Sequence, residues 1–305
     1  METPFVFGKI ATDQNFTDRR VETERLLQNF RSLTNTIIIS PRRWGKSSLV
    51  IHAAKQLLMS EENVKLCMID LFNVREEEEF YTLLAKEVLT SVSSKWEEIA
   101  VNAKNFLARL IPRISFTADV ESELSFGIGL EELKRNPDDI LDLAEVLAVS
   151  KNIRLIICID EFQNVANFGD SLAFQKKLRA HWQRHSHVAY CLFGSKRHML
   201  MDVFANVSMP FYKFGDLMFL QKIETEEWIP FIRQKFQMAN KVIERDEVQL
   251  LVELVDNHPY YVQQLAQQVW LRTEKLVVPS IVKEAYNGLI DQLSLLFLNS
   301  METFS

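Results

Sequence analysis

The sequence contains few cysteines and no long hydrophobic run, and both absences exclude classes of protein. Its 305 residues include three cysteines, Cys67, Cys158 and Cys191, each in a short apolar run typical of a buried strand. We interpret them as small core residues rather than as a disulfide or zinc framework, which fits a reducing compartment. No apolar run approaches the roughly 18 residues that a membrane helix needs, and no N-terminal signal segment is recognisable. We therefore expect a cytoplasmic protein without membrane contact.

A large excess of charge of either sign is also missing. The formal net charge is −6, charged residues make up 25% of the chain and apolar residues 47%, which is ordinary for a globular protein. This balance does not support a protein that mainly coats nucleic acid, although a local basic face stays open. At this length we expect one large α/β domain with a smaller domain appended to it.

The polar stretch from Ser40 to Ser48 lies between two apolar patterns. A β-branched run at residues 36–39 precedes it, and a helical pattern from Leu49 to Met59 follows it. The order predicts a strand, a loop and a helix. In that arrangement the loop N–H groups and the helix N-terminus point at one place, which suits a chain of phosphates. The residues of this predicted phosphate loop are Pro41, Arg42, Arg43, Trp44, Gly45, Lys46, Ser47 and Ser48.

Two residues of the loop have specific expected roles. Lys46 is expected to reach the β- and γ-phosphates and to act in catalysis, and the Ser47 hydroxyl is expected to hold Mg²⁺. The Walker A pattern has a glycine six residues before its lysine, and Ser40 occupies that position here. The loop alone is therefore weak support, and the rest of the chain must decide.

A second apolar strand, predicted from Arg154, ends in the adjacent carboxylates Asp160 and Glu161, as a Walker B segment does. Parallel strands bring their C-terminal ends to one edge of a sheet, where ligands bind. We expect Asp160 to hold Mg²⁺, directly or through water, and Glu161 to orient and deprotonate the water that attacks the γ-phosphate. Either half alone also occurs in ordinary βα units. Together, in this order and spacing, they predict a site for ATP and Mg²⁺.

Further predicted strands cover residues 64–71 and 188–193, and a last strand-like stretch ends near Ile223. Ser195 follows the strand at 188–193, beside the expected position of Asp160, and is a candidate sensor of the γ-phosphate or the attacking water. Near the N-terminus, Phe16 and Arg19 precede an amphipathic helix at 21–30. The two residues either line a base or ribose pocket beside the loop or belong to a helix that covers the sheet edge.

Three other patterns have less specific interpretations. A charge run at 76–79 predicts a helix start, and alternation within residues 105–132 predicts an inserted β-hairpin. A predicted helix at 171–184 carries Lys176, Lys177, Arg179 and Arg184, for which a solvated positive face is the default and a trans-acting arginine or a nucleic-acid contact the alternatives. Metal binding is disfavoured for His181, His185 and His187.

From residue 224 the pattern is wholly helical. Apolar residues recur at helical spacing in segments 226–239, 246–257, 260–276 and 281–298. Pro259 and Pro279 lie at junctions between these segments, where proline readily begins a helix. We therefore expect an α/β core at residues 1–223 and a helical lid at residues 224–305.

Taken together, these segments resemble the STAND branch of P-loop ATPases, relatives of AAA+ proteins, and in particular the archaeal-type ATPase group that is also found in bacteria. The resemblance extends over nearly the whole chain. Its most distinctive part is the Pro-Arg-Arg-aromatic-Gly-Lys-Ser form of the loop. The residues that carry it are Phe16-Thr17-Asp18-Arg19, the loop from Ser40 to Ser48, Cys158-Ile159-Asp160-Glu161-Phe162, Phe193-Gly194-Ser195 and Asn257-His258-Pro259-Tyr260-Tyr261.

The resemblance implies a three-layer α/β/α core followed by a helical lid, with ATP and Mg²⁺ bound at their junction. It also implies that His258 and Pro259 stand where the family's Gly-x-Pro motif approaches the nucleotide, with Asn257 in place of the glycine. The leading hypothesis is an ATPase that couples Mg-ATP binding and slow hydrolysis to a core–lid switch, and thereby to self-association or a protein partner. The alternatives are a nucleotide-gated signalling or defence scaffold with negligible turnover, and a DNA-associated ATPase.

Overall fold

The computed structural model describes residues 3–93 and 137–302. The chain forms two compact units, which we describe separately. The sheet unit contains residues 22–42 and 53–219, and the helical unit contains residues 1–21, 43–52 and 220–305. The hairpin predicted within residues 105–132 lies outside the described residues.

The sheet unit is built on five strands in the order β2-β3-β4-β1-β5. All neighbouring strands pair in parallel, so every strand ends at the same edge of the sheet. At that edge the register pairs Asp70 with Asp160 and Ile39 with Gly194. The strand bounds are β1 Thr36–Ile39, β2 Val64–Asp70, β3 Arg154–Asp160, β4 Val188–Gly194 and β5 Asp216–Phe219.

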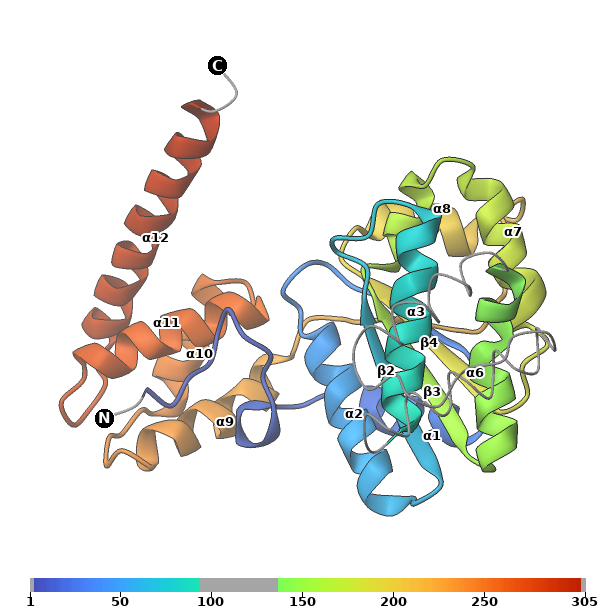
Figure 1. Ribbon diagram of the computed structural model, residues 1–305. Coiled ribbons are helices and arrows are strands. Elements are labelled where there is room, and N and C mark those ends of the chain that lie inside the picture. Colours follow the sequence, from blue (N-terminus) through green and yellow to red (C-terminus); the bar gives the residue numbers. More distant parts are fainter. Residues whose placement is uncertain (1–2, 94–136, 303–305) are drawn as a thin grey trace, which may run out of the picture. The chain divides into compact units, whose positions relative to one another are not determined.

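Helices cover both faces of this sheet, as the predicted three-layer class requires. On one face α3 (Glu77–Val92), α6 (Pro137–Lys151) and α7 (Ser171–Trp182) share a core with β2, β3 and β4 (Figure 1). The helix α2 (Lys46–Ser60) connects β1 back to β2, against the direction of the other crossovers. Because such crossovers are right-handed, α2 covers the opposite face, with α1 (Arg20–Arg31). An ion pair of 3.0 Å joins Arg31 to Glu61, the residue after α2.

Aromatic rings fill the core of the sheet unit around Trp182, which is only 1% exposed. The indole stacks on Tyr190 of β4 with the ring centroids 4.1 Å apart. Its centroid lies 6.2 Å from that of Phe162, which begins the short helix η2 (Phe162–Asn167) after β3. Its contact with Phe211, at 6.0 Å, reaches the segment between α8 (Arg197–Ala205) and β5. The rings therefore tie together the segments that follow β3 and β4, the two strands whose ends carry predicted site residues.

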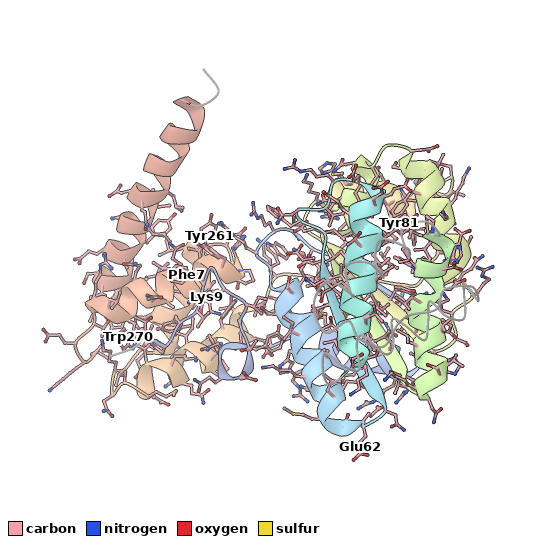
Figure 2. All side chains as sticks on the ribbon, in the orientation of Figure 1. Phe7, Lys9, Glu62, Tyr81, Tyr261 and Trp270 are labelled. Atoms are coloured by element: carbon pink, nitrogen blue, oxygen red, sulfur yellow. The ribbon has the colours of Figure 1, made fainter. Side chains whose placement is uncertain are left out.

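The helical unit has a core of its own. The four predicted helices are confirmed as α9 (Thr225–Gln237), α10 (Arg245–Leu254), α11 (Pro259–Arg272) and α12 (Pro279–Glu302), and their buried residues form one cluster (Figure 1). The N-terminal segment belongs to this unit, since Phe5 packs on Phe236 at 5.9 Å. The ring of Phe7, labelled in Figure 2, packs edge-on against Tyr260 at 5.7 Å.

The predicted strands at 36–39, 64–71, 154–160 and 188–193 are confirmed, and so are the helix starts at residues 77 and 171. The last strand was predicted too long, since β5 ends at Phe219 rather than near Ile223. Throughout residues 3–93 and 137–302, no helix combines the length and the apolar character that crossing a bilayer would require.

Gly215 lies against the backbone of Asn35, which leaves no room for a side chain. A Cβ at this residue would lie 2.2 Å from the Asn35 carbonyl oxygen, which accepts the β5 hydrogen bond from Asp216 N at 2.8 Å. We expect Gly215→Ala to lower the free energy of unfolding by about 1–3 kcal/mol, because backbone must move to make space. Urea denaturation followed by circular dichroism measures this, with Gly169→Ala as the control in open space. Equal stability of the two variants would contradict the expectation.

Candidate functional site

The predicted phosphate loop leads from β1 into the first turn of α2. Arg43 and Gly45 have positive φ angles of 66° and 88°, which turn the chain back on itself before the helix. The Gly45 carbonyl accepts the first helical hydrogen bond, from Leu49 N at 2.9 Å, so the amides of residues 46–48 form the N-terminus of α2. Lys46 begins the helix and is only 7% exposed. The loop therefore ends at a helix N-terminus that carries a buried cation.

Ser40 has an ordinary backbone conformation, so this position does not require the first glycine of the Walker A pattern. Its φ angle is not positive, unlike that of Gly45, and its side chain is completely buried. The hydroxyl donates to the Pro41 carbonyl at 3.0 Å. A side chain is therefore accommodated at this position.

Within the helical unit the loop contacts the start of α11. The Arg43 guanidinium lies over the Tyr260 ring, 4.4 Å from its centroid, and Trp44 packs edge-on against His258 at 6.3 Å. Asp256 and Asn257 precede this helix with φ angles of 53° and 54°. Asparagine tolerates that left-handed conformation better than most residues, so Asn257 provides a backbone shape that glycine also favours.

His258 is held in an environment that favours its neutral form. Burial lowers the pKa of the imidazole, and the positive charges of Arg43 and Lys222 add to this effect. Its Nδ1 atom is buried and has no hydrogen-bond partner among the described residues. Because such atoms are usually satisfied in native proteins, this nitrogen is a candidate ligand atom.

The N-terminal segment contacts the same loop. Phe16 stacks on His52 of α2 at 4.1 Å, and the Ser48 hydroxyl accepts a hydrogen bond from Ala11 N at 3.0 Å. Arg19 donates to the Trp44 carbonyl at 3.4 Å. The helical unit thus contains residues 43–48 of the predicted phosphate loop. It also contains the other residues that were predicted to bind nucleotide, Phe16, Arg19, His258 and Pro259.

The predicted acids lie in the sheet unit, where β3 ends. The Asp160 carboxylate accepts a hydrogen bond from Glu161 N at 2.8 Å, and Glu161 has a left-handed φ of 52°. This turn directs the chain sharply away from the strand into η2. Leu71 N donates to the Asp160 carbonyl at 3.1 Å, which ties the end of β3 to the end of β2.

Glu161 is held by hydrogen bonds from the two segments next to it. The Ser195 hydroxyl and Ser195 N donate to Glu161 Oε2 at 3.0 and 3.3 Å, and Gln163 Nε2 donates to the same oxygen. Ser195 was predicted beside Asp160, and it donates to Glu161, the next residue in the chain. Sequence reasoning missed Gln163, whose only signal was its place two residues after the acid.

Gly194 leaves the space that the Gln163 side chain occupies. A Cβ at Gly194 would lie 1.8 Å from Gln163 Oε1 and 3.3 Å from Glu161 Cα. Gln163 is 1% exposed, so its amide has no room to move aside without disturbing the core. The end of β4 therefore approaches the acid closely because residue 194 has no side chain.

Comparison with known proteins gives matches in structure alone. No protein-family model matches the sequence, and neither does any curated protein. The Walker-type ATPase PABY2304 of Pyrococcus abyssi matches with a TM-score of 0.66 and 16% identity, over 99% of this chain and 80% of that one. The ORC2 protein of Aeropyrum pernix, in its ADPNP-ADP complexes, matches with a TM-score of 0.60 and 14% identity, over 93% and 72%.

A third match is the ORC1 protein of Aeropyrum pernix in complex with DNA, with a TM-score of 0.56 and 10% identity, over 91% of this chain and 66% of that one. Identities this low establish a shared fold. The chain has the fold of AAA+ P-loop ATPases. The five-stranded parallel sheet and the C-terminal helices belong to this AAA+ fold.

On this AAA+ fold most cations of the basic segment 171–184, which contains α7 and the two residues after it, have partners in their own chain. Lys177 pairs with Asp138 at 2.9 Å and Arg184 with Asp142 at 3.8 Å. Arg179 lies over the Phe214 ring at 4.9 Å, and burial lowers the pKa of its guanidinium. These contacts engage three of the four cations that sequence reasoning assigned to a solvated face or a nucleic-acid contact.

His181 near the end of α7, and His185 and His187 after it, contact carboxylates of α6. Asp142 Oδ1 lies 2.7 Å from His181 Nδ1 and 3.2 Å from His185 Nε2, and Glu145 pairs with His187 at 2.9 Å. Burial raises the pKa of Asp142, but the hydrogen bonds from His181 and His185 outweigh it and lower the pKa overall. In the part of the chain that the structure describes, no cluster of three or more His, Cys, Asp or Glu could hold a metal ion.

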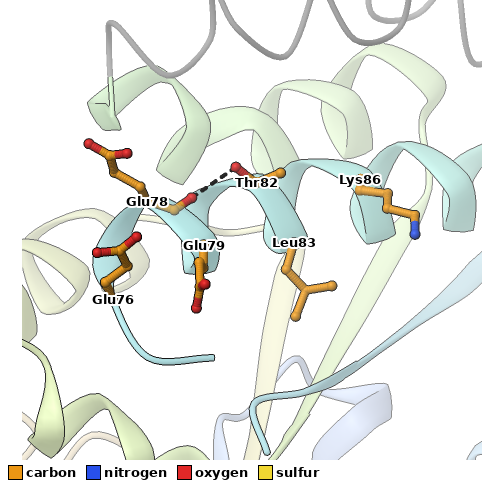
Figure 3. Close-up of a pocket in the computed structure, with 6 residues that line it drawn as sticks. All are labelled: Glu76, Glu78, Glu79, Thr82, Leu83 and Lys86. Atoms are coloured by element: carbon orange, nitrogen blue, oxygen red, sulfur yellow. Dashed lines mark hydrogen bonds between the residues drawn. The ribbon is translucent and has the colours of Figure 1, made fainter. Parts of the chain in front are cut away.

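A hollow of about 360 Å³ lies along the first turns of α3 (Figure 3). None of the predicted site residues lines it. Its lining residues are Glu76, Glu78, Glu79, Thr82, Leu83 and Lys86.

His185 makes stability depend on pH. Burial lowers the pKa of its side chain, which is 3% exposed, below that of an unfolded histidine, about 6.5. As the pH falls below this value, the unfolded chain takes up a proton before the folded chain does, because its histidine has the higher pKa. The free energy of unfolding is therefore highest above about pH 6.5 and decreases as the pH falls towards the pKa of the folded state. We expect His185→Gln to flatten the decline in unfolding free energy between about pH 6.5 and 5.

Denaturation at several pH values measures that slope. His198→Gln, at an exposed residue, is the matched control and should keep the slope of the wild type. His258, whose pKa is also lowered, contributes in the same direction and leaves a residual slope in the variant. An unchanged slope in His185→Gln would contradict the assignment.

Proposed function

We propose that this protein is an ATPase of the STAND type that binds Mg-ATP at residues 40–48 and hydrolyses it slowly with the acids at the end of β3. The observation that carries the proposal is the parallel sheet, in which β1 and β3 end at the same edge with only β4 between them. The phosphate loop follows β1 directly, and the carboxylates close β3. Likeness of fold to a Walker-type ATPase supports the same reading.

The phosphates would be bound by the loop and the first turn of α2. The amides of that turn would donate hydrogen bonds to anionic oxygens, and the helix dipole adds to their attraction. The Lys46 ammonium neutralises the charge on the β- and γ-phosphates. Its low exposure favours this role, because a charge that is shielded from water acts more strongly on a bound anion.

The donor chemistry of two residues fits Mg²⁺. Magnesium prefers oxygen ligands and is commonly bound by one or two carboxylates together with substrate phosphates. Asp160 offers a carboxylate and Ser47 a hydroxyl, and we assign both as metal ligands. When bound, the ion neutralises charge on the phosphate oxygens.

Water activation is assigned to Glu161. Its carboxylate accepts hydrogen bonds from Ser195 and Gln163, so its orientation is fixed before any substrate arrives. One carboxylate oxygen, Oε2, receives all three of these bonds. We assign the attacking water to this carboxylate, which accepts its proton.

The remaining predicted contacts concern the nucleoside. We assign Phe16, Arg19, His258 and Pro259 to the nucleotide pocket, together with Pro41 and Arg42 of the loop. The contacts of Phe16 and Arg19 with α2 and the loop support this grouping, as does the buried Nδ1 atom of His258.

We also propose a switch between a core of residues 1–223 and a lid of residues 224–305, through which nucleotide state controls self-association or a protein partner. The contacts of Arg43 with Tyr260 and of Trp44 with His258 support it, because they join the phosphate loop to α11. A cation over an aromatic face contributes about 0.5–2 kcal/mol, enough to couple a loop to a helix.

Lys46 tests the phosphate loop. We expect Lys46→Ala to abolish detectable ATP binding by calorimetry, since the loop then lacks its phosphate-binding cation. Lys65→Ala, which removes an exposed lysine of β2, should bind ATP as the wild type does. Tight ATP binding by Lys46→Ala would remove the basis for this assignment.

Glu161 separates slow turnover from a scaffold that binds nucleotide without hydrolysing it. We expect Glu161→Gln to keep ATP affinity and to lower kcat by about 10²–10⁴-fold, because the amide no longer accepts the proton of the water. Ser195→Ala, which removes one of the donors to Glu161, should lower kcat less and leave KM unchanged. Phosphate release measures both. Identical rates for wild type and Glu161→Gln would favour the scaffold.

A further inference from the structure

Arg19 occupies an unusual place for an arginine. It has a left-handed φ of 64°, immediately before α1, and it is only 3% exposed. One guanidinium nitrogen, Nη2, donates to two backbone carbonyls that are far apart in the sequence, Trp44 at 3.4 Å and Gln221 at 2.7 Å. The guanidinium thus bridges the phosphate loop and the segment that leads into α9.

The bond to the Trp44 carbonyl determines the direction of the next amide. In a trans peptide the carbonyl and the N–H of the same plane point in opposite directions, and the described residues contain no cis peptide. With the Trp44 carbonyl directed at Arg19, Gly45 N–H points away from Arg19. Gly45 has a φ of 88° and no side chain, so without such a bond little would prevent this peptide from flipping.

We propose that Arg19 is a positioning residue for the phosphate loop, which holds the Trp44–Gly45 peptide so that Gly45 N–H is available to the triphosphate. The inference rests on the proposed function of the loop. It gives Arg19 a role through the loop backbone, in addition to any contact with base or ribose. A guanidinium suits this role, because it stays charged and a charged donor makes a stronger hydrogen bond.

The second bond of Arg19, to the Gln221 carbonyl, holds the guanidinium itself in place. Gln221 lies just before α9, which packs in the core of the helical unit through Trp228 and Phe236. Arg19 therefore does not merely follow the loop but ties it to a packed element. Lysine cannot reproduce this arrangement fully, because its single ammonium lacks the planar, preorganised donor geometry of arginine.

Inorganic triphosphate distinguishes this role from a base-binding one, because it has phosphates but no base or ribose. We expect Arg19→Met to weaken binding of Mg-ATP and of magnesium inorganic triphosphate by the same factor, at least about tenfold, as expected when a hydrogen bond to a charged donor is lost. Arg19→Lys should recover part of both affinities. Calorimetry and competition with ATP measure them. Weaker ATP binding with unchanged triphosphate binding would overturn the proposal.

Arg25→Met is the matched control, because Arg25 makes an exposed ion pair with Asp216 in the sheet unit. It should bind both probes as the wild type does. Thermal unfolding of each variant shows whether it is folded before its affinities are compared.

A second measurement needs no nucleotide and so separates failure of this inference from failure of the proposed function. The chain has five tryptophans, and labelling with 5-fluorotryptophan gives each a fluorine resonance, with Trp44 assigned through Trp44→Phe. In Arg19→Met we expect the Trp44 resonance to shift or broaden and those of Trp182, Trp228 and Trp270 to stay in place. An unchanged Trp44 resonance would overturn the positioning role, whatever the nucleotide affinity.

Discussion

Parallel pairing of β1 and β3 on either side of β4 is the constraint on which the rest of the structure depends. The interiors of these strands are buried on both faces and carry apolar side chains, so charged groups occur only where the strands end. Because all the strands run in one direction, those ends share an edge. The hydrogen-bond register of the sheet thereby determines which polar residues become neighbours, and the helices on each face stabilise that register.

In each unit a predicted site residue takes part in hydrogen bonds that fix its surroundings. In the sheet unit Glu161 accepts bonds from Ser195 and Gln163, and in the helical unit Arg19 donates to the carbonyl of Trp44. In both cases a charged group is bound to partners from a different segment, which fixes its orientation at the cost of side-chain freedom. Side chains that are held in this way have little conformational entropy left to lose when a further contact forms.

The strands, the helices and the two motif segments could be predicted from the sequence, because each depends on local periodicity and on residues adjacent in the chain. The role of Gln163 could not, because its bond to Glu161 depends on the left-handed turn at residue 161 and on the space that Gly194 leaves. The bridging role of Arg19 could not either, because its partners lie in segments that only the tertiary fold brings close. The basic residues at 171–184 show the same limit: their spacing indicated a positive face, but it could not indicate that carboxylates of α6 pair with Lys177 and Arg184. Whether a serine fits at position 40, where the Walker A pattern has glycine, could be decided only from the φ angle in the structure.

The Gln163 side chain fills the space next to Glu161 that a side chain at position 194 would occupy. A larger residue at 194 requires a smaller one at 163, and the shorter side chain would no longer reach the carboxylate. Sequence change at this edge is therefore restricted to paired replacements, or to none. The glycine that ends β4 therefore restricts which residues evolution can place at position 163, thirty-one positions before it in the chain.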